Sequence, residues 1–181
     1  MRTVFLSMQL SLDGYVAGPS GQPDFVENSF TPDLLNYVTD TMRDSDTILF
    51  GRVAFEEQSG HWPTATDDLA PMMNGYDKIV FSSTLKDVSA WQNSRLATAP
   101  LSEEIAQLKS LPGKNIFVSG GARLAQSLMR EGLLDELRLY VHPVTVGSGI
   151  ALFPDKQQLT LTDTKSLEGG VVLHTYRFAA N

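Results

Sequence analysis

Hydrophobic and polar side chains alternate along residues 4–12, the period-two pattern of a β-strand. Asp13-Gly14 ends this pattern, and the segment that follows, up to Pro23, holds too many Gly and Pro residues for a regular element. Three short apolar runs have the length and composition of buried strands, at residues 47–50, 78–81 and 115–118. The chain is therefore expected to contain a sheet with a largely buried interior.

Helical segments are expected between these strands. Thr31-Pro32-Asp33 has the features of a helix start, with a hydroxyl at the N-cap, a proline at the first position and a carboxylate in the first turn. Further helices are predicted over residues 53–58 and 102–109, and from 122 until Gly132. Because strands and helices alternate along the chain, most of the sheet should be parallel.

From Asp135 onward the alternating pattern returns without intervening helices, at residues 137–141, 159–161 and 171–178. We interpret these segments as antiparallel strands that complete the sheet. With no repeat or linker to divide the chain, the sequence predicts one α/β domain over residues 1–181: a mixed, mostly parallel central sheet with flanking helices and antiparallel C-terminal strands. A half-apolar ribbon carrying Tyr140, Val172 and Tyr176 predicts a homodimer.

The amino-acid composition and charge limit the kinds of molecule that this protein is expected to bind. Residues are 42% hydrophobic and 19% charged, as in ordinary globular proteins, and no apolar run approaches the roughly 20 residues of a membrane helix. We find no secretory signal, so a cytoplasmic location without membrane partners is expected. The net charge of −7 disfavours nucleic acid. The absence of cysteine and the wide spacing of the three histidines indicate that no metal is bound.

Small or cationic residues follow three of the predicted strands, namely Gly51-Arg52, Ser82-Ser83 and Ser119-Gly120-Gly121. Ligands of parallel sheets bind at the carboxyl ends of strands, where free N–H groups of helix N-termini can donate hydrogen bonds to phosphates. Taken singly, Gly51 and Gly121 are better explained by tight strand-to-helix turns, but their occurrence together favours a dinucleotide. The G-x-G-x-x-G, P-loop and G-x-S-x-G motifs are all absent.

Taken in order along nearly the whole chain, five segments resemble the dihydrofolate reductase-like reductases. Within them, the similarity is greatest to the riboflavin-biosynthesis reductase domain, the RibD C-terminal domain, and its stand-alone relatives. The segments are SLDGYVA at 11–17, LFGR at 49–52, VFSS at 80–83, VSGGAR at 118–123, and HPVTVGSG at 142–149 followed by LF at 152–153.

The resemblance implies NADPH as the cofactor. Arg52, Ser83 and Arg123 would converge on its 2′-phosphate, and a cis peptide would join Gly120 to Gly121. Asp13 and Trp62 would border a small-molecule substrate. The implied cofactor-binding residues are Ala17, Gly51, Arg52, Ser82, Ser83, Ser119, Gly120, Gly121, Ala122 and Arg123.

Two residues are candidates for supplying a proton. Asp33 matches the helix carboxylate of the folate enzymes, but its distance from Gly51 is longer than in that pattern, and it also serves as an acid in the first turn of its helix. His142 ends a predicted strand and faces either the site or the core. The expected function is an NADPH-dependent reductase that transfers hydride to a pterin-like or ribosylaminopyrimidine-type substrate. The alternative is a catalytically idle dinucleotide-binding or dimeric interaction protein of the same fold.

Overall fold

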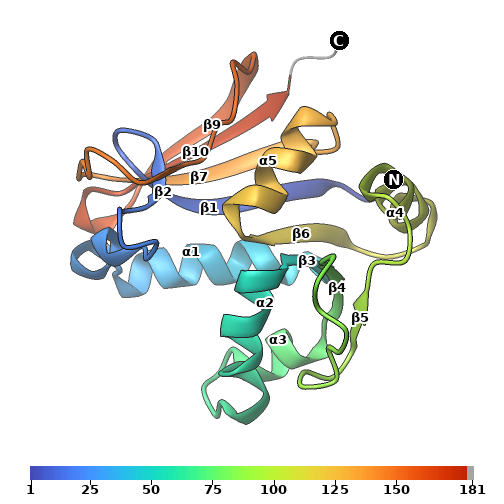
Figure 1. The fold of residues 1–181 in the computed structure, drawn as a ribbon. Helices are drawn as coiled ribbons and strands as arrows, with labels where there is room; N and C mark the ends of the chain where they lie inside the picture. The colour runs from blue at the N-terminus through green and yellow to red at the C-terminus, as the bar shows by residue number, and fades with distance from the viewer. Residues whose placement is uncertain (179–181) are drawn as a thin grey trace.

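The computed structural model describes residues 1–178 and contains an eight-stranded sheet in the order β5-β4-β3-β6-β1-β7-β10-β9 (Figure 1). The strands from β5 to β7 in this order all run parallel, and β10 is antiparallel to both of its neighbours. Their bounds are β1 Val4–Ser11, β3 Ser45–Gly51, β4 Asp77–Phe81, β5 Ser94–Leu96, β6 Asn115–Gly120, β7 Glu136–His142, β9 Leu159–Ser166 and β10 Val172–Phe178. The predicted α/β domain with a mixed, mostly parallel sheet is confirmed.

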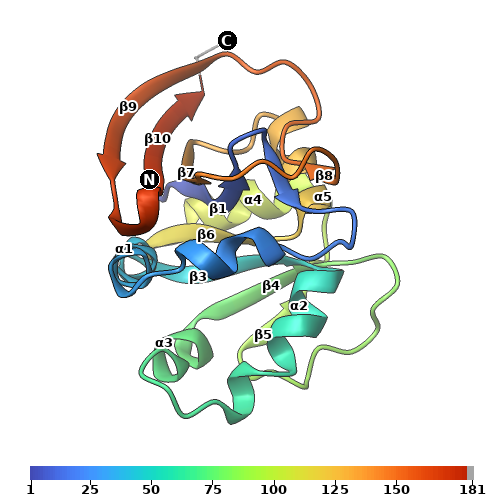
Figure 2. The same ribbon diagram turned by 90° about the vertical axis from the view of Figure 1, so that its left-hand side faces the viewer.

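Helices cover both faces of the sheet (Figure 2). Side chains of α1, α2 and α3 pack on the face of the sheet that carries Phe5 and Phe50, whereas side chains of α4 and α5 pack on the face that carries Leu6 and Val118. The helices are α1 Pro32–Arg43, α2 Arg52–Ser59, α3 Ala70–Gly75, α4 Leu101–Ser110 and α5 Ala122–Arg130, with 3₁₀ turns η1 Asp24–Ser29, η2 Trp62–Thr64 and η3 Glu168–Gly170. A separate pair of short strands, β2 Tyr15–Ala17 and β8 Ile150–Ala151, joins two loops.

Local signals account for where several elements begin and end. The Thr31 side chain accepts a hydrogen bond from the Leu34 backbone nitrogen at 3.2 Å, and Pro32 occupies the first turn of α1. This is the N-cap that the sequence predicts, and it satisfies an N–H group that would otherwise lack a partner. Gly132, at φ 65°, follows the end of α5, where a residue without Cβ adopts the left-handed conformation at little cost.

The direction of β7 corrects one prediction. The sequence pattern after Asp135 indicated only antiparallel strands, but β7 pairs in parallel with β1, and only β10 and β9 form an antiparallel hairpin. The reason is that α5 carries the chain back across the sheet, as in other parallel crossovers. The short elements β5, β2 and β8 were not predicted, because each has too few residues to show a periodic pattern.

Tyr140 does not lie on the exposed ribbon to which the sequence analysis assigned it. Its side chain is fully buried against α1, and its hydroxyl lies 3.1 Å from Thr41 Oγ1. Val172 and Tyr176 pair with Val141 and Leu137 on β7, so their side chains project from the face of the sheet opposite to Tyr140. Side chains alternate along a strand, which is why neighbours in this ribbon have such different surroundings. The homodimer itself stays a prediction.

Candidate functional site

The three strand ends that carry the dinucleotide-like residues are adjacent in the sheet. β3 lies between β4 and β6, with Gly51 paired to Phe81 and Phe50 paired to Gly120. Gly51 also approaches α5: a Cβ atom on it would lie 3.6 Å from the Cβ of Leu124. The loops after β4, β3 and β6, and the first turns of α2 and α5, therefore lie side by side.

The double glycine after β6 faces open space. Gly120 has φ 128°, a conformation that L side chains rarely adopt, and Gly121 has φ 11° and ψ 143°. A Cβ atom on either residue would meet no atom within 4 Å. The predicted cis peptide is wrong, since residues 1–178 contain no cis bond. The bend comes instead from backbone torsion at Gly120, which glycine adopts at far less cost than the roughly 3 kcal/mol of a non-proline cis peptide.

Two helices begin at this edge with unsatisfied N–H groups. Gly51 is the N-cap of α2 and Gly121 is the N-cap of α5, and neither position supplies a side-chain acceptor. The first N–H groups of a helix have no partner within the helix, and they carry its partial positive charge. The edge of the sheet thus presents two sets of hydrogen-bond donors, without a Cβ atom at either cap.

Cationic and hydroxyl side chains occur in the first turns of α2 and α5 and in the loop after β4. Arg52 Nη1 lies 2.6 Å from Glu56 Oε2, one turn later on α2. The Arg123 side chain is exposed and makes no hydrogen bond or ion pair with any of residues 1–178. Ser82 Oγ accepts from the backbone of Leu85 at 2.9 Å and so closes the turn after β4, whereas Ser83 is exposed.

A hydrogen-bonded chain of side chains links Trp62 to the double-glycine edge. The Trp62 indole Nε1 donates to Gln58 Oε1 at 3.2 Å, and Gln58 Nε2 donates to Ser119 Oγ at 3.2 Å. Both Trp62 and Ser119 were predicted to belong to the site. Gln58 was missed, because one glutamine on a short helix has no pattern that distinguishes it from a solvated residue.

Asp13 connects the loop after β1 to the segment that follows β7. Its carboxylate accepts hydrogen bonds from Ser11 Oγ at 2.7 Å and from the backbone nitrogens of Val146 and Gly147 at 3.1 and 2.8 Å. Partial desolvation acts to raise the pKa of Asp13, but these hydrogen bonds outweigh it and hold the pKa below its ordinary value. The structure thus gives Asp13 a role in joining two loops.

Ala17 lies at the same loop junction, buried in β2. Gly149 passes so close that a Cβ atom on it would lie 2.1 Å from the Ala17 oxygen, so this crossing requires a glycine. The pairing of β2 with β8 therefore depends on backbone contact between the loop after β1 and the segment after β7.

The two candidate proton donors lie in different surroundings. Asp33 Oδ2 accepts from the backbone nitrogen of Glu168 at 3.1 Å, which binds it to the segment before β10. His142 is fully buried on the α1 side of the sheet, with Nδ1 2.5 Å from Ser29 Oγ and Nε2 2.7 Å from Gln9 Oε1. Burial lowers the pKa of His142, so the neutral ring is favoured.

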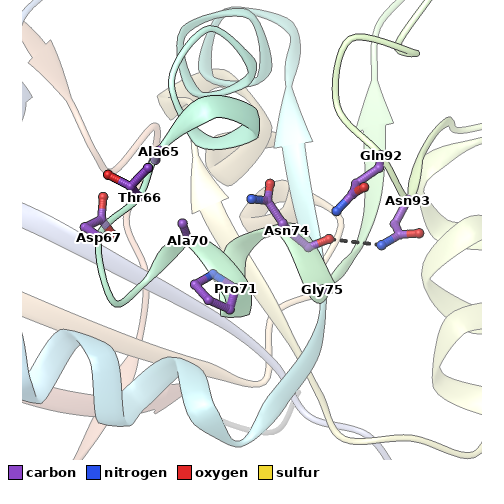
Figure 3. A pocket seen from close by; sticks show the side chains of 9 residues that line it. All are labelled: Ala65, Thr66, Asp67, Ala70, Pro71, Asn74, Gly75, Gln92 and Asn93. Atoms are coloured by element: carbon purple, nitrogen blue, oxygen red, sulfur yellow. Dashed lines mark hydrogen bonds between the residues drawn. The ribbon is translucent and has the colours of Figure 1, made fainter.

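Two hollows lie away from the double-glycine edge. One of about 430 Å³ is lined by Asp67, Asn74, Gln92 and Asn93 among others, beside the amino ends of β4 and β5 (Figure 3). The other, of about 480 Å³, has mainly apolar walls from β1, β7 and β10, and of the predicted site residues it contacts Asp13. Within residues 1–178, no three His, Asp or Glu side chains are grouped so as to hold a metal, and no helix could cross a membrane.

Comparison with known sequences establishes the family. Residues 2–175 match the family described as the RibD C-terminal domain. The chain is 32% identical to the uncharacterized protein YyaP of Bacillus subtilis, over 98% of this chain and 95% of that protein. It is 30% identical to YwjB of the same organism, over 97% of this chain and 98% of YwjB. This chain belongs to the RibD C-terminal domain family.

Solved structures agree on the fold. A putative riboflavin biosynthesis protein from Shewanella sp. PV-4 superposes with a TM-score of 0.81 at 20% identity, covering 98% of this chain and 99% of that one. RibD of Acinetobacter baumannii superposes with a TM-score of 0.72 at 15% identity, covering 99% of this chain and 59% of the longer RibD. The fold is that of the RibD and dihydrofolate reductase-like domains, as the sequence resemblance predicted.

Proposed function

We propose that this protein is an NADPH-dependent reductase that transfers hydride to a small heterocyclic substrate, pterin-like or of the ribosylaminopyrimidine type. The observation that carries the proposal is the convergence of Gly51-Arg52, Ser82-Ser83 and Gly120 to Arg123 at one edge of the sheet. Family membership supports a reductase. A Thermotoga maritima relative of the same fold is described as a deaminase and 5-amino-6-(5-phosphoribosylamino)uracil reductase.

The residues at this edge fit a dinucleotide phosphate. The open space at Gly120 and Gly121 would allow a diphosphate to approach the backbone, and the free N–H groups of α2 and α5 would donate to it. Arg52, Ser83 and Arg123 would bind the 2′-phosphate, reversing locally the repulsion expected from a net charge of −7. Bound NADPH would supply the hydride.

The remaining contribution of the chain would be to orient the reactants and exclude water. Gln58 would hold Ser119 and Trp62 in place beside the double glycine. Asp13 would hold the loop after β1 against the segment after β7. The proton would come from Asp33, from His142 or from an ordered water, and the full burial of His142 favours one of the other two.

Cofactor binding and substrate turnover test the proposal separately. NADPH at a hundred times its Kd should stabilise the folded protein by about 2.7 kcal/mol, measured as a rise in Tm. Oxidation of NADPH should then depend on a dihydropteridine or a ribosylaminopyrimidine. Binding without turnover of either class would favour the idle dinucleotide-binding alternative. A protein that binds no nicotinamide cofactor would contradict the proposal.

A further inference from the structure

Polar side chains occupy the middle of the sheet face that carries α1 and α2. β6 and β1 are the fourth and fifth of the eight strands, and Ser119, Ser7 and Gln9 project from them on the same face as Phe5 and Phe117. Central strands of a parallel sheet usually bury their side chains under helices. These three side chains are only partly buried, so the sheet face is accessible here.

Gln9 lies on β1, the strand next to the one that carries the double glycine. β1 and β6 are paired up to Leu6 and Val118, and the two strands continue from there toward Gln9 and Gly120. Gln9 therefore projects from the strand beside the one whose end carries the proposed cofactor site. A substrate that received hydride at this edge would rest against the same face of β1.

The amide oxygen of Gln9 already has a partner. It lies 2.7 Å from Nε2 of His142, and an amide oxygen only accepts, so Nε2 carries the proton of the imidazole. A neutral ring then has a lone pair on Nδ1, which lies 2.5 Å from Ser29 Oγ. The Ser29 hydroxyl also lies 3.4 Å from the Val26 oxygen, and we assign its single proton to the shorter contact with Nδ1. Phe25 packs its edge against the imidazole, with ring centroids 5.7 Å apart. With this assignment Ser29 donates to Nδ1 of His142, and Nε2 of His142 donates to the amide oxygen of Gln9.

The amide nitrogen of Gln9, in contrast, is free. It makes no hydrogen bond with any of residues 1–178, and it is not among their buried polar atoms that lack a partner. Because His142 holds the oxygen, the amide cannot rotate to offer an acceptor on the open side. Gln9 therefore presents donors alone to whatever occupies this face of β1.

We propose that Gln9 selects a substrate ring carrying a carbonyl oxygen, and that His142 and Ser29 are positioning residues that fix the direction of its amide. The inference rests on the proposed function, since the substrate must lie beside the double glycine. A ring with an amino group in place of that oxygen would set two donors against each other and leave both without an acceptor. Such a mismatch should lower affinity about tenfold or more.

Matched ring pairs test this selection. With the protein saturated by NADPH, we would measure the Kd of isocytosine against 2,4-diaminopyrimidine, and of pterin against 2,4-diaminopteridine, each pair at a pH where both of its members are neutral. In each pair an amino group replaces the carbonyl oxygen. Wild type should prefer the carbonyl member, and Gln9→Glu, which offers an acceptor, should shift the preference toward the amino member. Gln107→Glu, at an exposed position of α4, makes the same charge change and should leave the ratio of Kd values as in wild type.

The positioning role is tested by the same ratio. His142→Leu should bring the two Kd values of a pair close together, because a released amide can rotate to satisfy either ring, and His142→Gln should restore part of the preference. Ser29→Ala should also reduce the preference for the carbonyl ring. This variant keeps the inference testable if His142→Leu does not fold. If His142 were only structural, its variants would weaken both members of a pair equally, and this result would overturn the positioning role.

Failure of this inference can be told apart from failure of the proposed function. A wild-type protein that does not bind NADPH would contradict the proposed function. A wild-type protein that binds NADPH but binds neither carbonyl ring, or binds both members of each pair equally, would overturn only the role of Gln9.

Discussion

Asp13 Oδ2 lies 2.8 Å from the backbone nitrogen of Gly147, and this hydrogen bond joins two loops that are 134 residues apart in the chain. Asp13→Ala should free this nitrogen and that of Val146 together. Hydrogen exchange at these two amides should then become faster, while the amides of β6, in the centre of the sheet, exchange as in wild type. Unchanged exchange at Val146 and Gly147 would show that the pairing of β2 with β8 is enough to hold the loops.

Cofactor preference should depend on two arginines. Wild type should bind NADPH more tightly than NADH by roughly tenfold or more, since charge-assisted hydrogen bonds to a 2′-phosphate are weakened but not abolished by exposure. Arg52→Ala combined with Arg123→Ala should remove most of this preference in a titration of both cofactors. Arg130→Ala, at the other end of α5, is the matched control. Equal wild-type affinities, or a double variant that keeps the preference, would contradict the assignment.

Asp33 should contribute more to stability than to turnover. Its carboxylate accepts from the Glu168 backbone and lies in the first turn of α1, so Asp33→Ala should lower the free energy of unfolding by about 0.5 to 1 kcal/mol. NADPH binding and turnover should change little. Urea unfolding and steady-state kinetics check the two effects. A large loss of turnover without loss of stability would instead identify Asp33 as the proton donor.

His142 should make the stability of the protein depend on pH. Burial lowers the pKa of His142. As pH falls below about 6.5, His142 therefore binds a proton in the unfolded chain but not yet in the folded chain. Stability should therefore fall with decreasing pH, by at most about 1.4 kcal/mol per pH unit, until the lowered pKa is reached. Urea unfolding at about pH 7.5 and about pH 5.5 should show a smaller difference for His142→Gln than for wild type. His61→Gln, at an exposed position, is the control.

We propose a homodimer that forms through the hairpin of β10 and β9. Leu161 on β9 is 51% exposed, and the apolar hollow beside Leu159 and Tyr176 is open on the same face of the sheet. Leu161→Lys should weaken self-association in sedimentation experiments at tens of micromolar, the range in which a weak dimer is populated. Leu111→Lys, at a residue that is 55% exposed after α4, is the control. A wild-type monomer at these concentrations would contradict the proposal.

Patterns that act over a few residues could be interpreted without the structure. The alternation in β1, the Thr31 cap and the Gly132 stop depend on torsion angles and neighbouring groups, and each appears where it was predicted. The convergence of Gly51 and Gly120 also followed, because parallel strands place their carboxyl ends at one edge.

The register of the sheet and the packing of its faces decided the rest. In the structure β7 is parallel to β1, Tyr140 is buried, and the peptide between Gly120 and Gly121 is trans. The register and the packing also brought Gln58 to Ser119, 61 residues away, and Gln9 to His142, 133 residues away. Such pairs leave no periodic trace in the sequence, because a hydrogen bond between distant side chains depends on which strands are neighbours and which way each residue faces.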